Sequence, residues 1–194
     1  MTTAVVTAAR SELSVLEVIK NRSSIRRYKD RPIPKDILMS ILEAARLAQS
    51  ANNGQPWQFI VVTDQVMKRR LVDAADGQNF VGESAAVIVC LAEPEASFPV
   101  GPFEGFLIDL SIAIENMVLT AWDLGVGSCW IGAFSEDEVK KLLDVPDSLR
   151  VMSLLTLGYP DEKIGSRYRK SLSEIVHYEK YGRKQTGRPT TARA

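Results

Sequence analysis

A helical pattern from Phe106 to Leu124 constrains the fold of this chain more than any other stretch of its sequence. A helix of this length, rising about 1.5 Å per residue, extends about 28 Å. A broad apolar stripe along it must be covered by other elements. The stripe comprises Leu110, Ala113, Ile114, Met117, Val118 and Ala121. Polar residues recur on the other side, so we expect the helix to cross the centre of the domain or a subunit interface, and not a membrane.

Shorter apolar runs predict the strands of a small sheet. The run 85–92 is apolar throughout, as expected for a strand buried on both faces. The other expected strands are 57–62, 127–134 and 151–157. Helical periodicity is expected over 36–48, 64–75 and 136–143. This irregular alternation predicts an α+β fold, with a small mixed or antiparallel sheet flanked by helices, and argues against a doubly wound nucleotide fold.

The first helix is expected to begin after Ser14, because Ser14 and Glu17 have the spacing of a capping box. Its expected apolar contacts are Leu13, Leu16 and Ile19. We expect a disordered N-terminus over 1–10 and a disordered tail over 183–194, because neither stretch offers core residues. The sequence therefore predicts one domain over 11–182.

Composition excludes several classes of function. The 24 Lys and Arg residues are offset by 24 Asp and Glu residues, so we expect no nucleic-acid partner. His177 is the sole histidine, and no residues have the spacing of a metal site. Cys90 and Cys129 each lie in an apolar run, which indicates buried free thiols in a reducing compartment. We find no signal peptide and no apolar run of about 20 residues, so we expect a cytoplasmic protein without a membrane span.

The stretch Arg22-Ser23-Ser24-Ile25-Arg26 could bind a phosphate group. If it is helical, Arg22 and Arg26 project from one face. Each guanidinium can donate two parallel hydrogen bonds to a phosphate, and each hydroxyl can donate one more. A charged hydrogen bond contributes about 1.5–3 kcal/mol, so three or four could anchor a phosphorylated cofactor. The alternative is a solvated basic helix end, because arginine near a helix C-terminus complements the helix dipole.

Other signatures of nucleotide binding or catalysis are absent from the sequence. There is no Walker loop, and Trp130 stands where the third small residue of a dinucleotide fingerprint would follow Gly125 and Gly127. A metalloprotease helix needs two histidines, and this chain has one. A serine triad would have to take its histidine, His177, from a late and polar segment.

Four stretches in order carry a resemblance to one family: 22–26, 53–57, 127–132 and 167–174. Over about residues 12 to 182 the chain resembles the FMN-dependent nitroreductases. The resemblance implies a three-layer nitroreductase-like fold. It also implies an obligate homodimer with FMN at the subunit interface and an extended C-terminal arm on each chain.

The resemblance also implies the roles of individual residues. The ribityl chain and phosphate of FMN would be held by Arg22, Ser23, Ser24 and Arg26. The phosphate site would be completed by Arg167 and Arg169, with Lys170 as an alternative to either. The loop that reaches the flavin from the partner subunit would contain Ser50 and Asn53, with Gln55 nearby. The flavin ring would be lined by Ile131 and Gly132, whose backbone offers an N–H to flavin N5; Gly132-Ala133 stands where some relatives carry glutamate and glycine.

The implied activity is that of an oxidoreductase, in which FMN takes a hydride at N5 from NADH or NADPH. The electrons then pass to a small acceptor, such as a nitroaromatic or a quinone, in a ping-pong reaction. No catalytic side chain and no metal are expected, because the cofactor carries the redox chemistry. The alternatives are a flavin-binding module without turnover, or a specialised relative of the dehalogenating or flavin-fragmenting kind. Such relatives usually carry extra lid segments, and the lid candidate in this chain is the short stretch 94–105.

Overall fold

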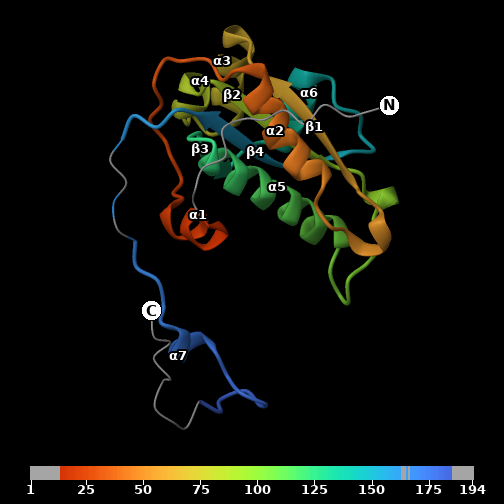
Figure 1. Cartoon of the computed structure of the whole chain (residues 1–194). Helices are drawn as coiled ribbons and strands as arrows, with labels where there is room; N and C mark the ends of the chain where they lie inside the picture. Colours follow the sequence, from red (N-terminus) through yellow and green to blue (C-terminus); the bar gives the residue numbers. More distant parts are fainter. Residues whose placement is uncertain (1–13, 163–164, 166, 185–194) are drawn as a thin grey trace, which may run out of the picture. The chain divides into compact units, whose positions relative to one another are not determined.

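The computed structural model describes residues 14–162, 165 and 167–184, and Figure 1 shows the course of the chain. The chain divides into two compact units, Met1–Glu162 and Lys163–Ala194. The expected disorder of 1–10, and of the tail 183–194 from residue 185 on, concerns positions outside the described residues. Arg183 and Lys184 are described, and both form hydrogen bonds. The single domain over 11–182 stays a prediction.

The first unit contains a sheet of four strands in the order β1-β2-β4-β3. These strands are β1 (Trp57–Val62), β2 (Ala86–Ala92), β3 (Gly127–Ile131) and β4 (Arg150–Gly158). Each neighbouring pair of strands is antiparallel. The sequence allowed a mixed or an antiparallel sheet, and the sheet is antiparallel. The expected α+β class is confirmed.

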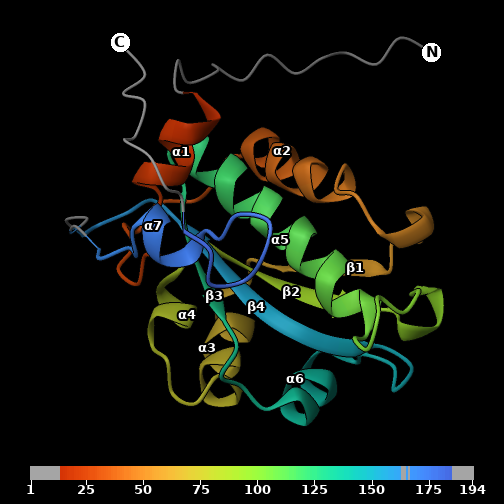
Figure 2. The same ribbon diagram turned by 90° about the horizontal axis from the view of Figure 1, so that it is seen from below.

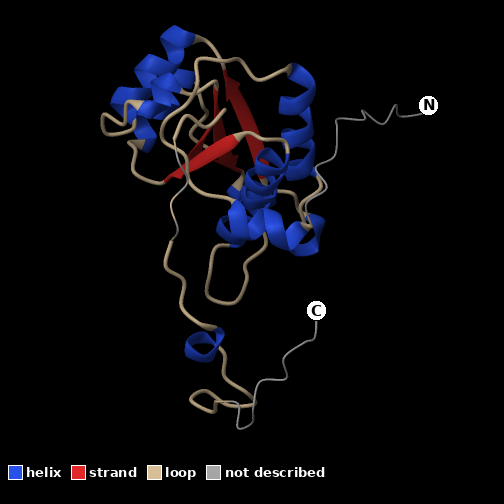
Figure 3. Ribbon diagram, turned by 60° about the vertical axis from the view of Figure 1, so that its left-hand side comes forward, coloured by secondary structure: helices blue, strands red, loops and turns tan. Residues whose placement is uncertain are grey.

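Helices cover both faces of the sheet, which gives three layers (Figure 2). All seven residues of β2 are buried, and their side chains alternate between two apolar clusters. Ile88 and Cys90 pack in the cluster that includes residues of α2 (Lys35–Arg46) and α5 (Gly105–Asp123). Val87 and Val89 pack in the other cluster, with residues of α3 (Gln65–Ala74) and α6 (Glu136–Leu143). Figure 3 shows the strands in red between these two helical layers.

The long helix α5 matches the sequence expectation and lies against α2 and the sheet. Gly125 follows it in a left-handed conformation, with φ of 75°, as expected for a residue that stops a helix. By length and composition α5 could also cross a membrane, which the sequence argument did not expect. Half of its apolar window is buried within the protein, and the core helix of a soluble protein meets the same criteria.

Helix α1 (Val15–Asn21) begins with the predicted capping box between Ser14 and Glu17. Its buried residue is Val18, whereas Leu16 and Ile19 are exposed. The expected packing of those two side chains is therefore wrong for the single chain, because the helix turns a different face to the core. Leu13 lies outside the described residues.

The remaining helical elements are short. One turn of helix, α4 (Phe80–Glu83), lies in the stretch between α3 and β2. The 3₁₀ turns are η1 (Ala51–Asn53) and η2 (Pro94–Ala96). The second unit contains α7 (Leu172–Ile175), which begins with a capping box between Ser171 and Glu174.

Candidate functional site

Residues 22–28, here called the strap, lie beside the edge strand β3. The backbone leaves the helical conformation at Arg22, where φ is −63° and ψ is 144°. Ser24 forms a parallel bridge with Ser128, and the N–H of Ile25 donates a hydrogen bond of 2.8 Å to the Ser128 carbonyl. The strap is therefore extended and continues the sheet, so the helical condition attached to Arg22 and Arg26 is not met.

The extended strap still places both arginines on one side. Successive side chains of an extended backbone point in opposite directions. Ser23 and Ile25 are buried, whereas Arg22 and Ser24 are partly exposed and Arg26 is exposed. Three of the four expected phosphate ligands therefore share a face, and the Ser23 side chain lies on the core side.

Two glycines allow the strap to lie close to the sheet. Gly127 and Gly158 are opposite each other in the β3–β4 ladder. A Cβ atom on Gly127 would lie 2.7 Å from Ile25 Cγ1, and one on Gly158 would lie 2.6 Å from Tyr28 Cδ1. Sequence reasoning missed this pair, although glycine at one end of each apolar strand was its visible signal.

The end of the strap is held by the buried hydroxyl of Tyr28. This hydroxyl donates to the Ile25 carbonyl at 2.6 Å and lies 2.7 Å from Thr156 Oγ1, within hydrogen-bonding distance. Burial raises the pKa of Tyr28 well above its ordinary value, so the hydroxyl keeps its proton at physiological pH. The network fixes the backbone between Ser24 and Arg26.

The guanidinium groups of Arg22 and Arg26 are available for binding an anion. The backbone N–H groups of Arg26 and Arg27 donate to Glu162 Oε1 at 2.6 and 3.2 Å. The guanidinium of Arg26 lies 5.9 Å from the centre of the Phe80 ring. Among the described residues, no carboxylate forms an ion pair with the side chain of Arg22 or Arg26. Both guanidinium groups can therefore bind an anion.

The end of β3 presents an open backbone position at Gly132. Ile131 is buried in the core, whereas Gly132 is exposed, and a Cβ atom added there would meet nothing within 4 Å. Trp130 is 37% exposed in the single chain, whereas Trp57 packs against the core. The predicted ring contact at Gly132 is thus sterically accessible, and its role stays a prediction.

The loop 50–55 adopts an unusual backbone. Asn52, Asn53 and Gln55 have φ of 49°, 57° and 51°, in the left-handed region. Ser50 Oγ accepts the N–H of Gln55 at 3.0 Å, and the Gln55 side-chain amide donates to the Asn53 carbonyl at 3.1 Å. The structure therefore brings Ser50, Asn53 and Gln55 together in one self-bonded loop.

This loop and the strap lie at opposite ends of α5. Asp109, in the second turn of α5, accepts a 3.1 Å hydrogen bond from the N–H of Ala51. The strap lies against β3, which follows the other end of α5. The 14 steps of the helix between Asp109 and Asp123 extend about 21 Å. Figures 1 and 2 show the same separation, so one copy of the chain does not bring the two groups together.

Arg167, Arg169 and Lys170 belong to the second unit and are exposed there. The guanidinium of Arg169 donates to the Tyr168 carbonyl at 3.1 Å. Their part in a phosphate site stays a prediction.

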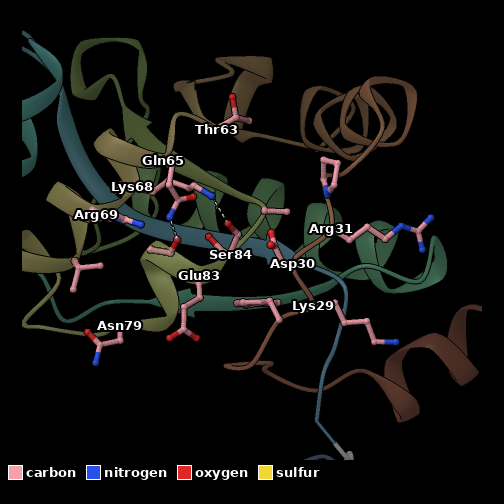
Figure 4. Close-up of a pocket in the computed structure, with 15 residues that line it drawn as sticks. Lys29, Asp30, Arg31, Thr63, Gln65, Lys68, Arg69, Asn79, Glu83 and Ser84 are labelled. Atoms are coloured by element: carbon pink, nitrogen blue, oxygen red, sulfur yellow. Dashed lines mark hydrogen bonds between the residues drawn. The ribbon is translucent and has the colours of Figure 1, made fainter.

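A separate polar cleft of about 880 Å³ lies between residues 28–32 and the helices α3 and α4 (Figure 4). Lys68 is buried beside it, and its ammonium group donates to the Ser84 carbonyl. Burial lowers the pKa of Lys68, and the charges of Asp30 and Asp64 oppose that effect. None of the predicted flavin ligands lines this cleft. Through this hydrogen bond Lys68 ties α3 to the chain that follows α4.

The profile of the nitroreductase family matches residues 19–97 and 65–159. A relative from Archaeoglobus fulgidus, whose name joins NADH dehydrogenase with NAD(P)H nitroreductase, is 43% identical over 76% of this chain and 87% of its own length. The chain belongs to the nitroreductase family. This membership confirms the resemblance and the expected class of enzyme, an oxidoreductase.

Solved structures of nitroreductase-family proteins share the fold. A nitroreductase family protein from Clostridium novyi has a TM-score of 0.75 and 37% identity, covering 89% of this chain and 97% of its own. An FMN-dependent nitroreductase from Clostridium difficile has a TM-score of 0.76 and 30% identity, covering 86% and 99%. The expected nitroreductase-like fold is therefore confirmed.

Proposed function

We propose that the protein is an FMN-dependent oxidoreductase that uses NADH or NADPH to reduce a small acceptor such as a nitroaromatic or a quinone. The observation that carries this proposal is the arrangement along β3. The face of Arg22, Ser24 and Arg26 lies beside Ser128, and the open backbone of Gly132 follows four residues later on the same edge. Cations and hydroxyls suit a phosphate and polyol chain, and an open backbone N–H suits a flat ring.

The residues present fit a flavin mononucleotide. Arg22, Ser24 and Arg26 would hold its phosphate and ribityl chain, and Ile131 and Gly132 would lie at its ring. A bound FMN would supply hydride transfer at N5 between NAD(P)H and the acceptor. The protein would contribute binding and orientation, and we assign no catalytic side chain.

We propose that the functional unit is a homodimer in which each copy contributes its loop 50–55 to the partner's strap. The separation of loop and strap along α5 supports this arrangement, because a two-fold axis across antiparallel α5 helices would bring them together. Helix α5 also has a second apolar face, at positions 108, 112, 119 and 122. With Glu115 included, these positions follow the alternating spacing of four and three residues that is typical of paired helices. Ile108 is 37% exposed and Leu107 is 45% exposed in the single chain. Burial of this face would favour dimerisation.

The cytoplasm is the compartment that we propose. Both cysteines are buried thiols, as predicted. Burial raises the pKa of Cys90 to about 12, so this thiol is unreactive. Cys129 is also buried, which favours an inert thiol.

The test begins with the visible spectrum of the purified protein. We expect a yellow protein whose flavin absorbance is bleached by NADH or NADPH under anaerobic conditions and returns on addition of a quinone or nitroaromatic. A protein that is colourless and takes up no added FMN would contradict the proposal. A protein that binds FMN but oxidises neither nicotinamide with any acceptor would instead indicate a flavin-binding module.

A matched pair of variants tests the phosphate site. Arg22→Ala should weaken FMN binding by about tenfold or more, because it removes a charge-assisted hydrogen bond. Arg70→Ala removes an exposed arginine of α3 and should leave FMN binding unchanged. Equal FMN affinities in the two variants would contradict the assignment of Arg22.

A further inference from the structure

The loop 50–55 needs support from outside itself. A left-handed conformation strains a residue that is not glycine, Asn less than most, and three residues of this loop adopt it: Asn52, Asn53 and Gln55. Such backbone strain persists only where the surroundings hold it. The hydrogen bonds of Ser50 and Gln55 are internal to the loop.

Asp109 supplies that support. In the part of the chain that the structure describes, it is the one residue outside the loop whose side chain bonds to residues 50–55. Its Oδ1 accepts the N–H of Ala51, immediately before the left-handed residues. A smaller role for Asp109 would be to complement the dipole of α5 as an acidic residue near the start of the helix.

The burial of Asp109 is not explained by stability. The residue is 3% exposed, and its Oδ2 has no hydrogen-bond partner among the described residues. A buried carboxylate with one partner is costly, and an apolar residue of similar size is often as stable or more stable. The cost indicates that the contact with Ala51 has a purpose beyond folding.

Asp109 also connects the loop to the face of α5 that we assign to the dimer. Leu107 and Ile108 immediately precede it and are exposed in the single chain. The hydrogen bond of Asp109 therefore holds the Ala51 N–H of the loop at the same helical turn that carries these exposed apolar side chains.

We propose that Asp109 is a positioning residue for the flavin site: its carboxylate holds the left-handed loop 50–55 in the conformation that each protomer presents to its partner's flavin. This inference rests on the proposed function. Its distinctive consequence is that Asp109 affects FMN affinity more than it affects stability, and that it acts through Ala51.

The experiment compares three variants with the wild type, using FMN affinity of the apoprotein, thermal stability of the apoprotein, and sedimentation. Asp109→Leu should keep the wild-type melting temperature and the dimer, but bind FMN about tenfold more weakly. Asp109→Asn keeps an acceptor oxygen for Ala51, so its FMN affinity should stay within about twofold of wild type. Asn116→Leu is the control, since Asn116 ties the same helix to the Ala44 carbonyl and not to the loop; its FMN affinity should be unchanged.

Ala51→Pro tests the same contact from the other side. Proline is favoured at the first position of a helical turn and Ser50 is already extended, so the change removes the N–H with little strain. It should weaken FMN binding as Asp109→Leu does, and the double variant should be no weaker than either single one. If Asp109→Leu does not fold, the FMN affinity of Ala51→Pro alone tests the positioning role.

Two failures are distinguishable. A wild type that binds no FMN removes the proposed function and this inference with it. A wild type that binds FMN while both Asp109→Leu and Ala51→Pro bind it equally well overturns the positioning role alone, as would additive losses in the double variant.

Discussion

At the scale of single residues, the candidate site depends on contacts that place the strap. The sequence suggested that Arg22 and Arg26 share a face, and they do, but through the period of an extended strand and not that of a helix. A separation of four residues is slightly more than one helical turn, and it is two repeats of an extended strand. Both geometries therefore put the two side chains on one side. The tertiary contacts of the strap with Gly127 and Gly158 could not be read from local patterns.

The glycine pair makes a prediction about stability. Gly158→Ala would place a methyl group 2.6 Å from the Tyr28 ring, which is held by its own hydrogen bonds. We expect it to lower the free energy of unfolding by about 1–3 kcal/mol, as overpacked sites do. Gly132→Ala is the control, because its added methyl meets open space.

Urea unfolding of the two alanine variants measures this difference. A Gly158→Ala protein as stable as the Gly132→Ala protein would show that the strap can move off the sheet without cost. FMN binding to Gly132→Ala should persist, because the backbone N–H that we assign to the ring remains.

At the scale of elements, most helices and strands follow from the sequence because their periodicities are long and uninterrupted. The expected strand 85–92 and helix 64–75 correspond to β2 and α3 within one residue at each end. The short helix α4 was not predicted, since four residues carry no periodicity. The exposed face of α1 was misassigned because periodicity shows that a helix has an apolar side, but not what covers it.

The contact between α6 and β4 makes a prediction about pH. Glu136 accepts hydrogen bonds from the Arg150 side chain at 2.9 Å and from the N–H of Val151 at 2.9 Å. The hydrogen bond from Arg150 is the main cause that lowers the pKa of Glu136. Because the folded pKa lies below the unfolded one, the contact stabilises the protein at neutral pH, and this stabilisation is lost as pH falls through the lowered pKa.

Glu136→Gln should therefore lower the free energy of unfolding by about 0.5–1 kcal/mol at pH 7, since Arg150 is largely exposed and its charge is screened. The difference from wild type should shrink as the pH approaches 3. Urea unfolding between pH 3 and pH 7 measures it. Glu43→Gln, which removes a fully surface pair with Arg46, should change stability less at every pH. A Glu136→Gln deficit that is constant over this range would contradict the electrostatic explanation.

At the scale of the whole molecule, the sequence predicts more of the site than one chain assembles. Ser50, Asn53 and Gln55 form one group and Arg22, Ser24 and Arg26 form another, and about 21 Å of helix separates them. The late basic residues belong to the second unit. A sequence pattern identifies the residue types that a flavin needs, but it does not say which copy of the chain supplies them.

The final prediction follows from this division. Ile108→Glu together with Ile112→Glu would place four charges at a two-fold α5 interface, where desolvation and repulsion are both unfavourable. We expect the variant to be monomeric in sedimentation velocity and to retain less FMN, because the partner's loop 50–55 is then missing from each strap. Ile108 is exposed, whereas Ile112 is partly buried at the margin of the core cluster, so circular dichroism is the measurement that separates loss of the dimer from loss of the fold.

Val66→Glu provides the control for that experiment. Val66 is 68% exposed on α3, in the layer on the other face of the sheet, so its substitution adds a charge to an apolar position without touching α5. It should remain dimeric and keep its FMN. If the α5 variant became monomeric yet bound FMN as tightly as wild type, each chain would hold a complete flavin site, and the loop 50–55 would have no part in it. If the α5 variant stayed dimeric, the interface would lie on another face, and the loop and the partner's strap would have to meet across that face.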